Sequence, residues 1–347
     1  MQYLSQADAQ IFNKKKVLVR LDLNVPISDS GVILESDTDR IHRSQKTIDF
    51  LKQAGAKIII ISHIGRDPQE TLKPVAEYMH ITLLEKYDEA VLDQEGIIML
   101  ENLRHDPREE KNDETFAKEL AAYADYYVND AFAVCHRQHA SVVTVPQLLP
   151  SFAGFQLEQE IQAMHQAMHP NHPALLIMGG AKFETKLPVI EQLLPSVDHV
   201  IIGGALANNF FKERGLDVGH SLIDTNTHLG DLIHNPKIVI SDQLVWQESR
   251  IVDILISEEI RTLITQAQTI IWNGPMGNYE NSFIQGTKDI AEAIAQTQAV
   301  SIVGGGDSIA LIQQLGMSEK FTFLSTGGGA MLEYLAQGTL PGIEALK

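Results

Sequence analysis

The chain has 347 residues, of which 44% are hydrophobic and 21% charged, a composition typical of a globular protein of about two domains. Its net charge of −18 disfavours nucleic acid and anionic membranes as partners, and no apolar run approaches the roughly 18 residues of a membrane span. The single cysteine, Cys135, excludes an internal disulfide and a Cys-rich zinc site. The N-terminus lacks the apolar core of a secretory signal, so we expect a reducing, cytoplasmic location.

Short apolar runs recur along the chain and predict strands. Most are β-branched and apolar at consecutive positions, which is typical of parallel strands buried on both faces. In the first half the predicted strands are 16–22, 57–62, 96–100 and 125–129. In the second half they are 174–178, 199–203, 237–241, 269–272, 300–303 and 321–325.

Stretches with helical periodicity lie between these runs. They include residues 44–55, 113–124, 187–197 and 307–316. Strand and helix in alternation predict an α/β protein with doubly wound parallel sheets. The strands are too many for one small sheet, so we expect two such Rossmann-like lobes.

The boundary between the lobes is predicted from two proline-containing breakers, 145–152 and 169–173, which flank a helical stretch at 154–168. A helix between two breakers is typical of a connecting element. We therefore expect an N-terminal lobe at 1–152, a connecting helix within 153–172 and a C-terminal lobe at 173–332, with the tail 333–347 able to pack back on the first lobe.

Polar side chains follow four successive predicted strands of the N-terminal lobe. In chain order they are Asp22 and Asn24, predicted on one face of the strand end, then His63 and Arg66, then Arg104, then Arg137. Arg40, which follows the acidic loop 35–39, is placed to reach the same edge. Any one arginine alone is better explained as a solvated surface residue. Ligands of open α/β sheets bind at the carboxyl ends of strands, however, and agreement between four ends predicts a site for a small polyanion.

Glycine-rich loops follow five predicted strands of the C-terminal lobe. They are MGGAK (178–182), IGGAL (202–206), WNGPMG (272–277), VGGGD (303–307) and STGGGA (325–330). Glycine lets the backbone approach a phosphate, and a following helix offers free N–H groups and the positive end of its dipole. The sequence has neither GxxxxGK[ST] nor GxGxxG, so a Walker site and a dinucleotide fingerprint are both absent.

Charged residues accompany two of these loops. Lys182 and Lys186 add two cations four residues apart after the first loop. Asp307 comes directly after three glycines, and Mg²⁺ is commonly held by one or two carboxylates together with substrate phosphates. Asp307 is therefore the candidate Mg²⁺ ligand.

Two other features are better explained as structural. His165, His169 and His172 have near-helical spacing, but a proline break separates the last two, so surface positions are favoured over a metal site. Cys135 lies beside His136 without a recognisable oxyanion hole or base, which favours a buried thiol over a nucleophile.

Taken as a set, these segments resemble the signature motifs of the phosphoglycerate kinase family, in the family's order and from about residue 11 to the end of the chain. The segments are KKVLVRLDLNVP, SHIGR, ENLR, NDAFAVCHRQHAS, GGAKFETKL, WNGPMG, VGGGDS and STGGGA. The resemblance implies two α/β lobes joined by a helix, a triose phosphate on the first lobe and Mg-ADP or Mg-ATP on the second. The implied reaction is reversible transfer of the acyl phosphate of 1,3-bisphosphoglycerate to ADP, giving 3-phosphoglycerate and ATP, by a hinge-bending monomer.

The resemblance also carries roles onto single residues. The triose-binding residues are Asp22, Leu23, Asn24, Arg40, His63, Ile64, Gly65, Arg66, Arg104 and Arg137. The nucleotide-binding residues are Lys182, Lys186, Gly203, Gly204, Glu280, Gly305, Gly306, Asp307 and Ser308, with Asp307 on the Mg²⁺. The catalytic groups are Arg40, Lys182 and the backbone of Gly327 and Gly328.

One departure from the family lies in the nucleotide lobe. Residues 252–259 read VDILISEE and lack the Gly-Pro that the family carries after Asp-Ile. This predicts a base slot of altered shape beside an unchanged phosphate cradle. The expected walls of the slot are Gly203, Gly204, Leu206 and the segment 254–256.

Two alternatives remain at this point. The first is a homologue that binds nucleotide or triose phosphate without turnover, against which the presence of Arg40, Lys182 and Asp307 argues. The second is an NAD-dependent dehydrogenase, which lacks its fingerprint here. A carboxylate nucleophile is already ionised at neutral pH, so the absence of a recognisable general base agrees with phosphoryl transfer to 3-phosphoglycerate.

Overall fold

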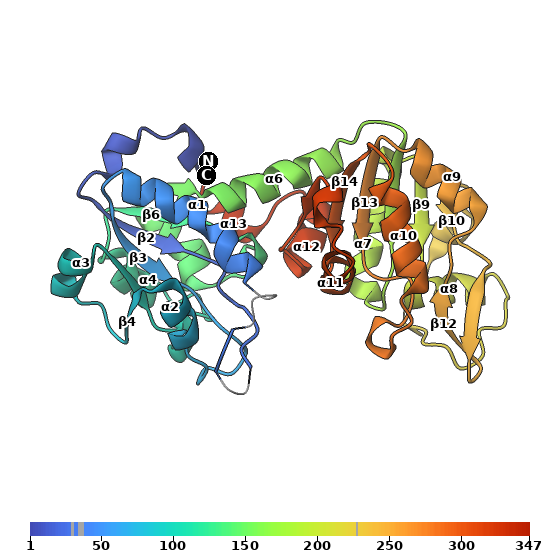
Figure 1. Cartoon of the computed structure of the whole chain (residues 1–347), viewed down its shortest axis with the longest axis horizontal. Coiled ribbons are helices and arrows are strands. Elements are labelled where there is room, and N and C mark those ends of the chain that lie inside the picture. Colours follow the sequence, from blue (N-terminus) through green and yellow to red (C-terminus); the bar gives the residue numbers. More distant parts are fainter. Residues whose placement is uncertain (29–30, 34–37, 227) are drawn as a thin grey trace. The chain divides into compact units, whose positions relative to one another are not determined.

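The computed structural model describes residues 1–28, 31–33, 38–226 and 228–347. The chain divides into two compact units, one made of residues 1–161 and 339–347 and the other of residues 162–338. Helix α6 (Phe155–Met168) carries the chain from the first unit into the second (Figure 1). No helix in the described part of the chain has the length and apolar character needed to cross a membrane.

The first unit is built on a parallel sheet with the strand order β1-β7-β6-β2-β3-β5-β4. Its strands are β1 (Gln2–Tyr3), β2 (Lys16–Arg20), β3 (Lys57–Ile61), β4 (Thr82–Leu84), β5 (Ile97–Leu100), β6 (Tyr126–Asn129) and β7 (Ser151–Ala153). Val17 and Val19 of β2 join an apolar cluster with Ile48 of α1 (Asp39–Gln53), while Leu18, between them, is equally buried on the opposite face. Burial on both faces explains why these strands are apolar at consecutive positions.

The other helices of this unit are α2 (Lys73–Met79), α3 (Glu89–Glu95), α4 (Glu114–Ala121), α5 (Val145–Leu148) and α13 (Pro341–Glu344). Two of them, α3 and α4, begin at side-chain caps, whereas α2, α5 and α13 carry a proline in the first turn. The Asp88 carboxylate accepts from the first amides of α3, and Asp113 accepts from Phe116 N in α4.

The second unit repeats the plan with the strand order β10-β9-β8-β13-β14-β15, again parallel. Its strands are β8 (Ala174–Met178), β9 (His199–Ile202), β10 (Ile238–Val239), β13 (Thr269–Asn273), β14 (Val300–Gly304) and β15 (Phe323–Leu324). Its helices are α7 (Phe183–Leu193), α8 (Gly204–Glu213), α9 (Glu258–Gln266), α10 (Gln285–Ala295), α11 (Gly306–Gln314) and α12 (Gly329–Gln337).

A small antiparallel hairpin, β11 (Leu244–Gln247) with β12 (Arg250–Ile254), was not predicted from the sequence. Several of its residues are exposed and polar, so it lacks the continuous apolar character of the central strands. Glu248 and Ser249 turn the hairpin with positive φ angles. The central strands were predicted to within one or two residues, whereas the segment predicted at 237–241 is a strand only over β10.

Candidate active site

In each sheet the chain first adds strands on one side of a starting strand and later adds the others on its opposite side. β2 lies between β6 and β3 in the first unit, and β8 lies between β9 and β13 in the second. Loops that leave the carboxyl ends of strands on the two sides of such a starting strand diverge, and ligands of doubly wound proteins bind there. The arginine-bearing segments follow β2, β3, β5 and β6, and the glycine-rich loops follow β8, β9, β13, β14 and β15.

Asp22 and Arg40 meet at the end of β2. Arg40, in the first turn of α1, donates from Nη1 to Oδ2 of Asp22 at 2.7 Å. The prediction that Asp22 and Asn24 share a strand face is wrong, because β2 ends at Arg20 and the Val25 amide folds back to the Leu23 carbonyl at 2.9 Å. Both side chains lie in the loop that follows the strand.

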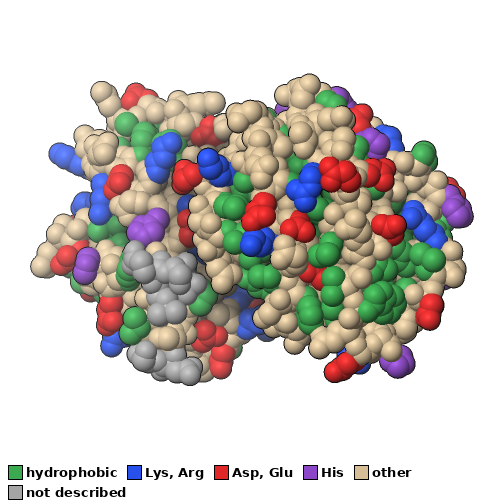
Figure 2. All heavy atoms as spheres, turned by 45° about the vertical axis from the view of Figure 1, so that its right-hand side comes forward, with side chains coloured by type: hydrophobic (Ala, Val, Ile, Leu, Met, Phe, Trp, Pro, Cys, Tyr) green, Lys and Arg blue, Asp and Glu red, His purple; other side chains and the backbone are tan. Residues whose placement is uncertain are grey.

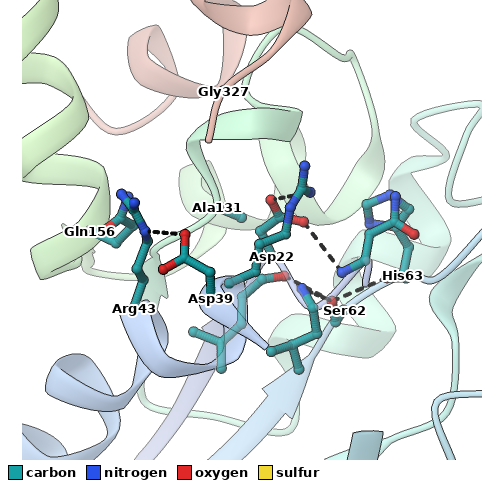
Figure 3. A network of polar contacts seen from close by, with 12 residues as sticks. Asp22, Asp39, Arg43, Ser62, His63, Ala131, Gln156 and Gly327 are labelled. Atoms are coloured by element: carbon teal, nitrogen blue, oxygen red, sulfur yellow. Dashed lines mark hydrogen bonds and ion pairs between the residues drawn. The ribbon is translucent and has the colours of Figure 1, made fainter. Parts of the chain in front are cut away.

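The loops after β2 and β3 are tied together. The buried Ser62 hydroxyl donates to the Leu21 carbonyl (2.9 Å) and accepts from Leu23 N (3.2 Å). Asn24 Oδ1 accepts from Gly65 N at 2.9 Å. Figure 3 shows Asp22, Ser62 and His63 gathered at these strand ends. Gly65 has φ +63°, and a Cβ there would overlap the carboxylate of Glu70, so glycine is required.

His63 is held by a buried arginine that the sequence analysis did not select. Arg20, at the last position of β2, is 1% exposed, and its Nη2 lies 3.1 Å from Nδ1 of His63. Burial lowers the pKa of His63 far below its usual range, and the charge of Arg20 lowers it further. Because a guanidinium can only donate, Nδ1 of the neutral imidazole accepts and the ring proton is on Nε2.

The remaining arginines approach the same loops. Arg104, which follows β5, is nearly buried, donates from Nη1 to the Gly65 carbonyl and pairs through Nε with Glu110 at 3.1 Å. Burial lowers its pKa, and Arg137, in the half-buried loop after β6, lowers it further. Arg66 is exposed on the loop after β3. Like charges that depress one another's ionisation form a site with high affinity for an anion.

In the second unit, helices start directly after glycine-rich loops. Gly203, Gly305 and Gly328 are the residues before the first turns of α8, α11 and α12. Gly305 has φ +94°, and a Cβ added at Gly306 would meet only open space. The starts of α11 and α12 are therefore open to an anionic ligand, because a Cβ at Gly328 or Gly329 would also meet open space. The start of α8 is closed, since the Gly204 amide donates to the Met276 carbonyl at 2.9 Å.

Lys186 is the most perturbed cation of this unit. It lies on α7, is 5% exposed, and donates from Nζ to Oδ1 of Asn273 at 2.9 Å. Burial and the charge of Lys182 lower its pKa to about 8, against a smaller opposing effect of Asp307. Lys182, the residue before α7, is exposed.

A pocket of about 540 Å³ opens beside these groups. It is lined by Gly180, Gly204, Pro275, Glu280 and Asp307, among others, and by the hairpin residues 250–254. Of the walls expected for a base slot, Gly204 and Ile254 line it, whereas Leu206 is fully buried inside the unit. Asn208, His220 and Arg250, which sequence reasoning missed, add polar groups to its lining.

The start of α11 suits a magnesium-bound polyphosphate. Asp307 is exposed at the pocket and Ser308 is fully buried with an Oγ that has no hydrogen-bond partner in the described part of the chain. No group of three His, Cys, Asp or Glu side chains that could enclose a metal occurs among the described residues. One carboxylate is the protein ligand expected for Mg²⁺ that takes its other ligands from phosphate and water, and the open amides beside it can bind the phosphates.

The structure also accounts for the cysteine. Cys135 is buried, and burial raises the pKa of its thiol to about 12, so it is not an activated nucleophile.

Comparison with known proteins decides the family. A family profile described as Phosphoglycerate kinase matches residues 7–237 and 233–338. A relative named phosphoglycerate kinase from Rubrobacter xylanophilus is 40% identical over 379 residues, covering 96% of this chain and 95% of the relative, and one from Thermus thermophilus is 38% identical over 381 residues, covering 96% and 97%. The phosphoglycerate kinase structure from Coxiella burnetii superposes with a TM-score of 0.84 at 30% identity, covering 99% of this chain and 98% of the other.

The chain belongs to the phosphoglycerate kinase family. Its two α/β lobes are those of that family, since the structure from Pyrococcus horikoshii also superposes over 100% of this chain and 98% of its own, with a TM-score of 0.83 and 30% identity. The reaction is the reversible phosphoryl transfer between 1,3-bisphosphoglycerate and ADP, and nothing among the relatives supports the non-catalytic alternative.

Proposed function

We propose that the first unit binds the triose and the second binds Mg-ADP or Mg-ATP, with the residues predicted above in their implied roles. The observation that carries the proposal is the contrast between the units. Guanidinium groups gather at the strand ends of one, and glycine-started helices with Lys186 and Asp307 gather at the strand ends of the other.

The triose is a small molecule with a phosphate at one end and a carboxyl or acyl phosphate at the other. Arg66, Arg104 and Arg137 would hold the distal 3-phosphate, with His63 donating from Nε2. Asp22 and Asn24 would bind the 2-hydroxyl and the carboxyl end. Leu23, Ile64 and Gly65 would complete the triose site with their backbone atoms.

The nucleotide phosphates would lie on the amides of Gly305, Gly306, Gly327 and Gly328, with Lys186 beneath them. The base would enter the pocket beside Gly203 and Gly204, with Glu280 on the ribose side. Asp307 would hold Mg²⁺, which neutralises phosphate charge when bound.

Catalysis then requires positioning and charge neutralisation without a general base, because the accepting carboxylate is already ionised. Arg40 and Lys182 would neutralise the equatorial oxygens of the transferring phosphoryl group. The lobes must close for the reaction and exclude water on closure. On the face drawn in Figure 2, acidic and basic side chains are interspersed, which disfavours nucleic acid and anionic membranes as partners. A monomer in the cytoplasm is the expectation that the family resemblance gives.

The test is a coupled assay of ATP formation from 1,3-bisphosphoglycerate and ADP on the wild type, Arg40→Ala and Arg43→Ala. Arg43 lies one turn further along α1 and pairs with Asp39 at 2.8 Å, so it serves as a matched control. We expect activity in the wild type and Arg43→Ala and its loss in Arg40→Ala. Equal loss in both arginine variants would mean that α1, rather than Arg40, is what the reaction needs.

A further inference from the structure

An asparagine of the second unit's pocket carries a hydrogen-bond acceptor without a partner. Asn208 lies on α8 and lines the pocket together with Gly204 and Ala205 of the same helix. It is 2% exposed and so lies at the floor of the pocket, whereas His220 and Arg250 are exposed and lie at its mouth. Oδ1 of Asn208 has no hydrogen-bond partner in the described part of the chain.

The orientation of this amide is fixed by its nitrogen. Nδ2 of Asn208 donates to the Leu222 carbonyl at 3.0 Å, and Leu222 also lines the pocket. Turning the amide over would place Oδ1 against the Leu222 carbonyl oxygen, and two acceptors form no hydrogen bond. The amide donor is therefore used within the protein, and the acceptor is the end that remains for a ligand.

The next residue on α8 provides a contrast. Asn209 is also buried, but both ends of its amide pair with Asp224: Oδ1 accepts from Asp224 N at 3.0 Å, and Nδ2 donates to the Asp224 carbonyl at 2.7 Å. Asn208 is among the described residues that line the pocket, and Asn209 is not. Two adjacent asparagines thus fasten the same segment to α8, and the unpaired acceptor belongs to the one that faces the pocket.

The chemistry of the missing partner follows from that acceptor. A buried carbonyl oxygen without a partner is unfavourable, so one in a binding pocket indicates a ligand that donates. Phosphate oxygens only accept, which leaves the base or the ribose of a nucleotide. Asn208 lies one helical turn beyond Gly204, on the side where the base is proposed to enter, whereas Glu280 is proposed on the ribose side.

We propose that Asn208 is a specificity-determining residue of the nucleotide site, and that its Oδ1 accepts from the 6-amino group of adenine. Guanine carries a carbonyl oxygen at the same position, which would face another acceptor. This inference rests on the nucleotide site of the proposed function.

The experiment compares two nucleotides that differ by one group, ATP and purine riboside triphosphate, which lacks only the 6-amino group. kcat/KM for each is measured in the reverse reaction at matched free Mg²⁺ for the wild type, Asn208→Leu and the control Asn209→Leu. We expect the wild type to prefer ATP by about ten-fold, as the loss of one neutral hydrogen bond allows. The preference should fall to about one in Asn208→Leu and stay at the wild-type value in Asn209→Leu.

The ratio separates recognition from structure, because a loosened pocket lowers kcat/KM for both nucleotides alike. A wild-type ratio near one would overturn the proposal, as would a ratio that is unchanged in Asn208→Leu or lost equally in Asn209→Leu. If Asn208→Leu does not fold, Asn208→Ala takes its place, and the wild-type ratio needs no variant.

Two further measurements identify other causes. If the Asn208 variant alters the preference for ATP over 2′-deoxy-ATP instead, the acceptor binds the ribose and the proposal is wrong. Failure of the nucleotide site itself is distinguishable, since Asp307→Asn would then leave Mg-ADP affinity unchanged, whereas failure of the Asn208 proposal alone leaves the effect of Asp307→Asn intact.

Discussion

We predict that Lys186 makes nucleotide binding sensitive to alkaline pH. Its ammonium group is buried beside the Asn273 amide, and burial together with Lys182 lowers its pKa from 10.5 to about 8. A protonated Lys186 attracts the phosphates, and a neutral one does not. Above pH 8, kcat/KM for Mg-ATP should therefore fall by up to about ten-fold per pH unit, because this parameter reports ionisations of the free enzyme.

The magnitude can be checked without turnover. Bound phosphates favour the charged lysine, so Mg-ADP binding should raise the pKa of Lys186 and take up about half a proton per site at pH 8. Calorimetry in two buffers of different ionisation enthalpy measures this uptake directly. Lys186→Met should bind without it, whereas Lys212→Met, at an exposed site on α8, should behave as the wild type.

Two results would refute this reasoning. The first is an Mg-ADP affinity that stays constant from pH 7 to well above pH 9 in the wild type. The second is proton uptake that persists in Lys186→Met, which would assign the ionisation to another group. Either would mean that Lys186 remains charged in spite of its burial.

Three further predictions concern the transferring group, the metal and the base. Arg40→Ala should lower kcat by at least about 10²-fold while 3-phosphoglycerate affinity changes much less, because one charge-stabilising donor is lost; a near-normal kcat with a large rise in KM would make Arg40 a ground-state anchor instead. Asp307→Asn should weaken Mg-ADP binding and spare 3-phosphoglycerate binding in separate calorimetric titrations, and an unchanged Mg-ADP affinity would assign the metal to another group. GTP should support the reverse reaction with kcat/KM within about 10²-fold of ATP at matched free Mg²⁺ if phosphates and Mg²⁺ supply most of the affinity; a much stronger ATP preference would show that polar lining residues such as Asn208, His220 and Arg250 build a specific adenine site.

The central strands of both sheets were predictable because they are buried on both faces and therefore carry continuous apolar runs, whereas the short strands β1, β4 and β7 were not predicted. β8 was predicted at its observed bounds, since every residue from Ala174 to Met178 is buried. The hairpin β11–β12 was missed because it is short and partly exposed, so it has no comparable signal. α7 begins four residues before its predicted start, since three of the first four residues, Glu184 to Lys186, are polar and lack the apolar periodicity of the residues that follow.

Only the motif residues of the candidate site could be predicted from the sequence, and the buried residues behind them could not. Motif residues at strand ends could be selected from the sequence, but Arg20 and Glu109 were not selected. Arg20 lies inside an apolar strand. A charged residue in such a strand indicates a buried polar contact, because a buried guanidinium needs a compensating partner. Glu109 is a buried carboxylate that accepts from Ser141 N at 2.9 Å. It gives no such signal, because it lies in an acidic, loop-forming segment and Ser141 is 32 residues away. Burial of one glutamate among several exposed ones is a property of the fold.

The return of residues 339–347 to the first unit has a consequence for synthesis on the ribosome. The Gly342 amide donates to the Cys135 carbonyl at 2.8 Å, and a Cβ at Gly342 would overlap Val142, so the chain's last residues close the loop region that bears Arg137. Both ends of the chain lie in this unit (Figure 1). The second unit is contiguous in sequence and is translated in full before residues 339–347, on which the first unit depends. Truncation before residue 339 is therefore expected to disturb the first unit rather than the unit translated just before it.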